Sequence, residues 1–217
     1  MSIEKKISQI QSQVGSKVSL VAVSKTKSEI EITRAYKFGQ RIFGENKVQE
    51  LVSKQNNLPK DIKWHMIGHL QRNKVKYIAP FISLIHGVDN LKLLKEINKQ
   101  AKKNNRKIDC LIQIKISSEE SKFGLTYNDA SSLLKSEFIS ELENINIAGF
   151  MGMASNTSEQ SILKKEFNLL NDFFNEFKKN DKNIKTLSMG MSNDYILAVD
   201  CGSNMIRVGS NIFGSRN

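Results

Sequence analysis

The chain has 217 residues and a mass of 24.6 kDa, which suits one domain or a minimal barrel and argues against a two-domain enzyme. Its mean hydropathy is -0.38, and no apolar run approaches the roughly 18 residues of a membrane span, so we expect a soluble protein. The polar, helix-like segment 1–15 lacks the apolar centre of a secretory signal, and we expect a cytoplasmic protein.

The formal net charge is +11, yet only six of the 33 basic residues are Arg and no aromatic residues stand among the lysine groups. Duplex readers favour Arg, and single-strand binders need aromatic platforms, so no nucleic-acid partner is expected. Two cysteines occur, Cys110 and Cys201, and neither has the CxxC spacing of a zinc site. Both are predicted to be buried, reduced thiols.

From the N-terminus onward, short apolar runs alternate with longer amphipathic stretches. A helix is expected before the first strand, and a helical pattern lies between each successive pair of strands. Strands are predicted to begin near Ser19, Arg41, Lys63, Ser83, Ile108, Ile145, Thr186 and Met205.

Helix starts are marked by capping residues. Ser28 with Glu31 forms a capping box, Asp89 or Asn90 precedes an apolar stripe, and Thr126 opens a further helix. The longest helix is predicted over 158–178. Its core-facing stripe consists of Ile162, Leu163, Phe167, Leu170, Phe173, Phe174 and Phe177.

Strands separated by helices imply a parallel sheet with right-handed crossovers. Eight such units at this length predict an α/β fold, a single-domain (β/α)8 TIM barrel with an extra N-terminal helix, covering residues 1–217. A doubly wound open sheet is the alternative, but no GxGxxG motif follows the first strand. In a barrel the functional residues lie at the carboxyl ends of the strands.

The first strand ends at Lys25, a charged residue directly after an apolar run. It either marks the exit of the strand to solvent or is a partly desolvated amine able to form a Schiff base with an aldehyde. Pyridoxal 5'-phosphate (PLP) is the commonest aldehyde cofactor held in this way.

The last two strands lead into Gly/Ser turns. Ser192 follows the seventh strand, where it is expected to cap the next helix and to present a hydroxyl to an anion. Gly209 and Ser210 follow the eighth, and these are the loops where barrels frequently bind phosphate. Arg207 lies two residues before Gly209, so both point to the same side of the strand. Arg207 could therefore face a cofactor or form a surface salt bridge.

Across essentially its whole length the sequence resembles the pyridoxal-phosphate homeostasis protein family, which is related in fold to the N-terminal barrel of alanine racemase. The segments that carry the resemblance are, in order, Val21–Lys27, Phe43–Asn46, Trp64–Lys74, Ser121–Gly124, Met189–Asp194 and Arg207–Ser210. Two mild departures are Ser28, where the family usually has Pro, and Ser210, where Thr is commoner.

The resemblance implies a role for each matching residue. Lys25 would be the Schiff-base lysine, and Arg207 would face the pyridine nitrogen. Asn46 would lie near the cofactor. The phosphate would be held by Ser192, Gly209 and Ser210.

The histidines do not indicate a metal site. His65 and His69 are four residues apart, but position 66 is not Glu, and a strand followed by a turn does not place both rings on one face. The resemblance implies that both lie near the barrel mouth. His86 is either a pocket residue or a core histidine, and Lys122 either contacts an anionic ligand or is a solvated charge.

The resemblance also implies a protein of intracellular PLP homeostasis, which buffers or delivers the cofactor to PLP-dependent apoenzymes without robust turnover. A PLP-dependent amino-acid racemase is the alternative, and a basic RNA-associated barrel is a third. A racemase needs a base on each face of the substrate carbon, and we expect no residues beyond Asn217 to form a second domain that supplies one. We expect a monomer.

Overall fold

Eight parallel strands form a closed barrel in the computed structural model, which describes residues 1–119 and 122–214. Each strand pairs with its neighbours in chain order, and β8 returns to pair with β1. The strands are β1 (Ser19–Val23), β2 (Ile42–Glu45), β3 (Lys63–Met66), β4 (Leu84–Val88), β5 (Ile108–Ile114), β6 (Ile145–Gly152), β7 (Thr186–Ser188) and β8 (Met205–Val208). The predicted barrel is confirmed.

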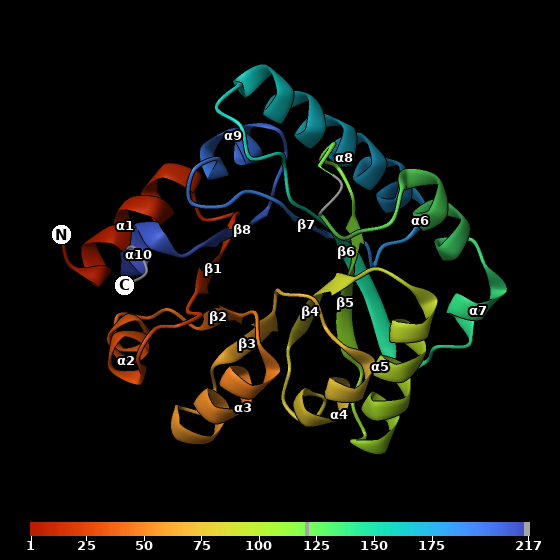
Figure 1. The fold of residues 1–217 in the computed structure, drawn as a ribbon, viewed down its shortest axis with the longest axis horizontal. Helices are drawn as coiled ribbons and strands as arrows, with labels where there is room; N and C mark the ends of the chain where they lie inside the picture. The colour runs from red at the N-terminus through yellow and green to blue at the C-terminus, as the bar shows by residue number, and fades with distance from the viewer. Residues whose placement is uncertain (120–121, 215–217) are drawn as a thin grey trace.

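Helices surround the strands (Figure 1). They are α1 (Ile3–Val14), α2 (Glu29–Lys37), α3 (Val48–Asn57), the 3-10 helix η1 (Arg72–Lys74), α4 (Val75–Ile78), α5 (Leu91–Lys103), α6 (Tyr127–Leu134), α7 (Glu137–Ser140), α8 (Gln160–Asn180), α9 (Tyr195–Asp200) and α10 (Ser210–Phe213). The extra N-terminal helix α1 packs beside α10. In the described part of the chain, no helix combines the length and apolar character needed to cross a bilayer.

The predicted caps form as the local sequence dictates. The Ser28 hydroxyl accepts from the N–H of Glu31, whose carboxylate accepts from the N–H of Ser28. Asn90, not Asp89, caps α5, and Thr126 caps α6. These side chains satisfy backbone donors that the first helical turn leaves unpaired.

Two apolar clusters stabilise the barrel. The larger one lies between the strands and the helices, and it includes both buried thiols, Cys110 and Cys201. A smaller cluster fills part of the barrel interior with Val21, Leu84, Leu111, Ala148, Met151 and Met205. Because side chains alternate along a strand, residues two positions from these also point inward.

One residue of the predicted core stripe is more exposed than expected, and one residue of the resembling segments lies outside the described residues. Ile162 of the predicted core stripe is 40% exposed, because the stripe on α8 that faces the sheet is narrower than the sequence pattern. Ser121, part of one resembling segment, lies outside the described residues.

Candidate functional site

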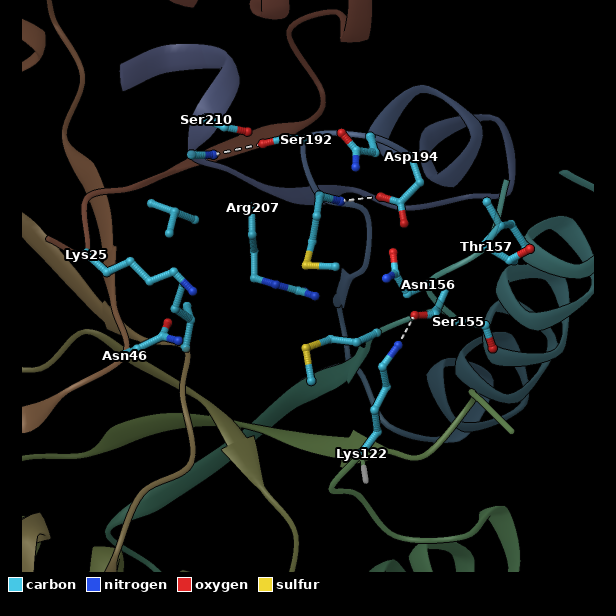
Figure 2. A pocket seen from close by; sticks show the side chains of 18 of the residues that line it. Lys25, Asn46, Lys122, Ser155, Asn156, Thr157, Ser192, Asp194, Arg207 and Ser210 are labelled. Carbon is cyan, nitrogen blue, oxygen red and sulfur yellow. Dashed lines mark hydrogen bonds between the residues drawn. The ribbon is translucent and has the colours of Figure 1, made fainter. Parts of the chain in front are cut away.

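A cavity of about 480 Å³ lies at the carboxyl ends of the strands. Segments from distant parts of the chain surround it, as Figure 2 shows for a selection of the side chains. All six site residues predicted from the sequence are among those that line it: Lys25, Asn46, Ser192, Arg207, Gly209 and Ser210.

Lys25 occupies a tight turn just beyond β1. The N–H of Lys27 donates to the Ser24 carbonyl over 3.0 Å and closes this turn. Since Val21 points into the barrel, Val23 and Lys25 follow it on the same side of the strand. Figure 2 shows the Lys25 amine directed into the cavity.

The turns after β7 and β8 are joined by Ser192. Its hydroxyl accepts from the N–H of Gly209 over 3.3 Å, and its carbonyl accepts from the side chain of Asn211 over 2.8 Å. The expectation that Ser192 caps the next helix is wrong, because α9 begins at Tyr195 after Asp194. Ser192 instead holds two loops together at one edge of the cavity.

Arg207 is a buried residue, so it does not form a surface salt bridge. Its guanidinium donates to the carbonyl and the hydroxyl of Ser188, over 2.9 and 2.7 Å, and to the Gly152 carbonyl over 3.0 Å. Burial lowers the pKa of Arg207 to about 10, against the opposing effect of the Asp194 carboxylate. Arg207 therefore remains charged at neutral pH.

A chain of polar side chains leads from Arg207 into the barrel interior. His86 lies 3.1 Å (Nδ1) from the Ser188 hydroxyl and 3.0 Å (Nε2) from His65 Nδ1. Arg207 can only donate, so the Ser188 oxygen accepts from it and the hydroxyl proton is left for His86 Nδ1. His86 Nε2–H then donates to His65.

His65 and His86 are both neutral at physiological pH. Burial lowers the pKa of His65 to about 3. Burial, and after it the neighbouring His65 ring and the Arg207 guanidinium, also lowers the pKa of His86. His86 is thus a core histidine with both ring nitrogens bonded.

His65 and His69 were both expected near the barrel mouth, but only His69 is exposed to solvent. His65 is in the interior, where the alternation of β3 places it, whereas the His69 ring stacks on Phe123 with its Nδ1 3.7 Å from Asp89. Within residues 1–119 and 122–214, no three His, Cys, Asp or Glu side chains are grouped so that they could hold a metal ion.

The loop after β6 also lines the cavity, although no motif in the sequence had marked it as part of the site. Ser155, Asn156 and Thr157 face the cavity across from Lys25 (Figure 2). Glu166 holds the loop by accepting from the N–H and the hydroxyl of Ser155, over 2.8 and 2.6 Å. The polar run directly after an apolar strand was the available signal.

Lys122 stabilises the same loop. Its ammonium donates to the Ala154 carbonyl over 2.5 Å and lies 3.0 Å from the Glu119 carboxylate, which accepts from the N–H of Asn156. Lys122 is therefore not simply a solvated charge.

Comparison with known proteins places the chain among related sequences and folds. The family model "Alanine racemase, N-terminal domain" matches residues 1–217. The chain is 37% identical to a pyridoxal phosphate homeostasis protein of Pasteurella multocida, over 100% of this chain and 99% of that protein. It is 39% identical to one of Schizosaccharomyces pombe, over 95% and 87% of the two chains.

Solved structures agree with this placement. PipY of Synechococcus elongatus, solved with PLP bound, superposes with a TM-score of 0.88 at 32% identity, over 98% of this chain and 100% of that chain. An alanine racemase of Clostridium difficile superposes with a TM-score of 0.81 over 99% of this chain and 60% of that one. At 15% identity, that likeness concerns the fold alone.

Proposed function

The chain belongs to the alanine racemase N-terminal domain family and, within it, to the pyridoxal phosphate homeostasis proteins, and from this we propose that it binds PLP in the cavity at the barrel mouth. The observation that carries the proposal is the convergence on one cavity of Lys25, Arg207 and the joined turns of Ser192 and Gly209.

The donor set of the cavity fits this cofactor. A volume of about 480 Å³ lies in the range of ligand pockets. The lining combines lysine and arginine cations with serine hydroxyls and asparagine amides, which suit an anionic ligand. Among the described residues that line the cavity, the only carboxylate is Asp194, and it accepts from the N–H of Met191 over 2.5 Å.

Each residue then has a defined task. Ser192 and Ser210 would hold the phosphate with donors at the two joined turns, and Gly209, whose N–H donates to Ser192, would let the backbone approach it closely. Lys25 would supply the amine, and Asn46 would lie beside the ring. When bound, PLP supplies an aldehyde whose carbon forms a double bond to an amine nitrogen, while the carbonyl oxygen leaves as water with two amine protons.

Arg207 favours storage of the cofactor over catalysis on it. A guanidinium donates a hydrogen bond to a pyridine nitrogen but does not give up its proton at neutral pH. The ring would then be a weaker electron sink than one protonated by a carboxylate. Arg207 is also fixed by three hydrogen bonds, so it cannot easily move away.

We also propose that the protein buffers PLP or delivers it to apoenzymes and lacks robust turnover. Across the cavity from Lys25, the side chains of Ser155, Asn156 and Thr157 carry no base at neutral pH, and the Asp194 carboxylate accepts from the N–H of Met191 (Figure 2). The Lys122 ammonium is held by Ala154 and Glu119. A racemase would need a second base on that face.

Spectroscopy with mapping of the adduct tests the cofactor assignment. Wild type, Lys25→Ala and the surface variant Lys99→Ala are mixed with PLP, reduced with borohydride and digested. We expect a visible absorption band in wild type and Lys99→Ala, absence of the band in Lys25→Ala, and a reduced adduct on Lys25. Adducts scattered over surface lysines would refute the site.

Two further assays separate a carrier from a racemase. The loaded protein is incubated with single enantiomers of amino acids, and separately with an apoenzyme that requires PLP. Reactivation of the apoenzyme without inversion of any amino acid is the expected result. Inversion that depends on Lys25 would establish the racemase instead.

A further inference from the structure

A buried group of charges lies behind the turn that carries Lys25. The Lys54 ammonium, on α3, lies 2.8 Å from the Glu45 carboxylate at the end of β2 and 2.7 Å from the Glu50 carboxylate. The side chains of Lys54 and Glu45 are 6% and 0% exposed. None of the three lines the cavity, so they have no direct contact with a ligand there.

This ionic cluster, defined here as Glu45, Glu50 and Lys54, binds the chain on both sides of Lys25. Before Lys25, the Ser24 carbonyl accepts from Lys54 over 2.8 Å and the Ser24 hydroxyl donates to Glu45 over 2.6 Å.

After Lys25, the N–H of Thr26 donates to Glu50 over 2.6 Å. One carboxylate oxygen of Glu50 therefore links Thr26 to Lys54. The residues immediately before and after Lys25 are thus both anchored to the same cluster.

The backbone held in this way has an unfavourable conformation. Thr26 has a φ of 64°, in the left-handed region that β-branched residues rarely adopt. Such a conformation persists only where surrounding contacts over-determine it, and it is found most often at functional sites. The hydrogen bond to Glu50 is one such contact.

The charges themselves are also expensive to bury. Desolvation raises the pKa of Glu45 in spite of its contact with Lys54, and Glu45 Oε2 has no hydrogen-bond partner within the described residues. A buried ion pair is often no more stabilising than apolar residues of the same size. Stability alone therefore gives little reason for this cluster.

We propose that Lys54, together with Glu45 and Glu50, positions Lys25 by holding the Ser24–Lys27 turn in the conformation that directs its amine into the cavity. The inference rests on the proposed function, because it concerns how this amine reaches the aldehyde of PLP. The three are positioning residues that act through the backbone on either side of Lys25.

The experiment compares Lys54→Met and the double variant Glu45→Gln/Lys54→Met with a matched control, Gln40→Met. Gln40 is also buried and also links β1 to β2, since its amide donates to the Leu20 and Ile42 carbonyls over 2.8 and 2.6 Å. It does so at the opposite end of the strands from Lys25.

Two readouts separate positioning from general stability. The first is the rate of formation of the covalent PLP adduct, mapped to Lys25 after reduction. The second is the affinity for pyridoxine 5'-phosphate, which has the ring and phosphate but no aldehyde. We expect the adduct to form about ten-fold more slowly in both cluster variants, with unchanged affinity for the aldehyde-free compound and a wild-type rate in Gln40→Met.

If the Lys54 variants do not fold, two variants of Glu50 test the same inference. Glu50 is partly exposed, and Glu50→Ala removes the Thr26 contact while Lys54 stays paired with Glu45. Glu50→Gln retains an acceptor oxygen and should restore much of the rate that Glu50→Ala loses. Wild-type rates in all cluster variants, or an equal loss in Gln40→Met, would overturn the inference. Absence of a Lys25 adduct in wild type would overturn the proposed function itself.

Discussion

Acidification from about pH 7.5 to about pH 5 should destabilise the ligand-free protein through its buried histidine pair. Burial lowers the pKa of His65 from 6.5 to about 3 and lowers that of His86 as well. Because the pKa of His65 is lower in the folded protein than in the unfolded chain, its contribution to stability is fully present above the unfolded pKa of 6.5. That contribution is lost as the pH falls toward the folded pKa of about 3. Protonation of unfolded His65 accounts for about 2 kcal/mol of lost unfolding free energy at about pH 5. His86 acts in the same direction.

Between about pH 7.5 and about pH 5, most carboxyl groups do not change their protonation state. Hydrogen bonds and nearby cations lower the pKa of Glu4, Glu31 and Asp61, and their effect begins only near the ordinary values of 4.5 and 3.8. Burial raises the pKa of Glu45, which favours the folded state on acidification. That contribution is common to wild type and to a histidine variant.

Urea unfolding followed by circular dichroism at both pH values measures the loss. Wild type is compared with His65→Gln, which removes one titrating ring but retains a polar side chain. His65→Gln is less stable than wild type at neutral pH, because the contact of residue 65 with His86 changes. On acidification, however, its unfolding free energy should fall by about 2 kcal/mol less than that of wild type. If both proteins lose the same free energy, the assignment of the pH dependence to buried, neutral His65 is refuted.

The remaining predictions concern packing, thiols and the anchor of Arg207. Gly149→Ala should lower the unfolding free energy by about 3 kcal/mol, because Gly149 has a φ of 147° and a Cβ there would lie 1.8 Å from a backbone oxygen. Gly39→Ala, with a φ of 111° and nothing within 4 Å, should lose only about 1 kcal/mol in the same denaturation assay. Burial raises the pKa of Cys110 and Cys201, so a thiol reagent should label neither until denaturant is added, and rapid native labelling would contradict their burial. Ser188→Ala should weaken PLP binding by about three- to ten-fold in an equilibrium titration, and an unchanged affinity would show that the guanidinium needs no anchor.

Local patterns in the sequence were enough to predict the architecture. Capping side chains such as Ser28 and Thr126 bond within their own first turn, so no distant residue was needed to predict them. The strand and helix alternation also depends on neighbouring residues, and eight repeats leave few arrangements other than a closed parallel sheet. Because the carboxyl ends of parallel strands meet at one edge, Lys25 and Arg207 were predicted to lie near each other.

The contacts between side chains inside the closed barrel could be learned only from the three-dimensional structure. The period of two predicts that His65 points inward, but it does not give the depth at which β3 faces β4, so the contact with His86 was not foreseen. Lys54 follows the pattern of an ordinary solvated helix lysine, yet α3 places it against the buried end of β2. Sequence periodicity reports the face of each element, whereas these contacts depend on strand register and on the closure of the barrel, which bring together residues far apart in the chain.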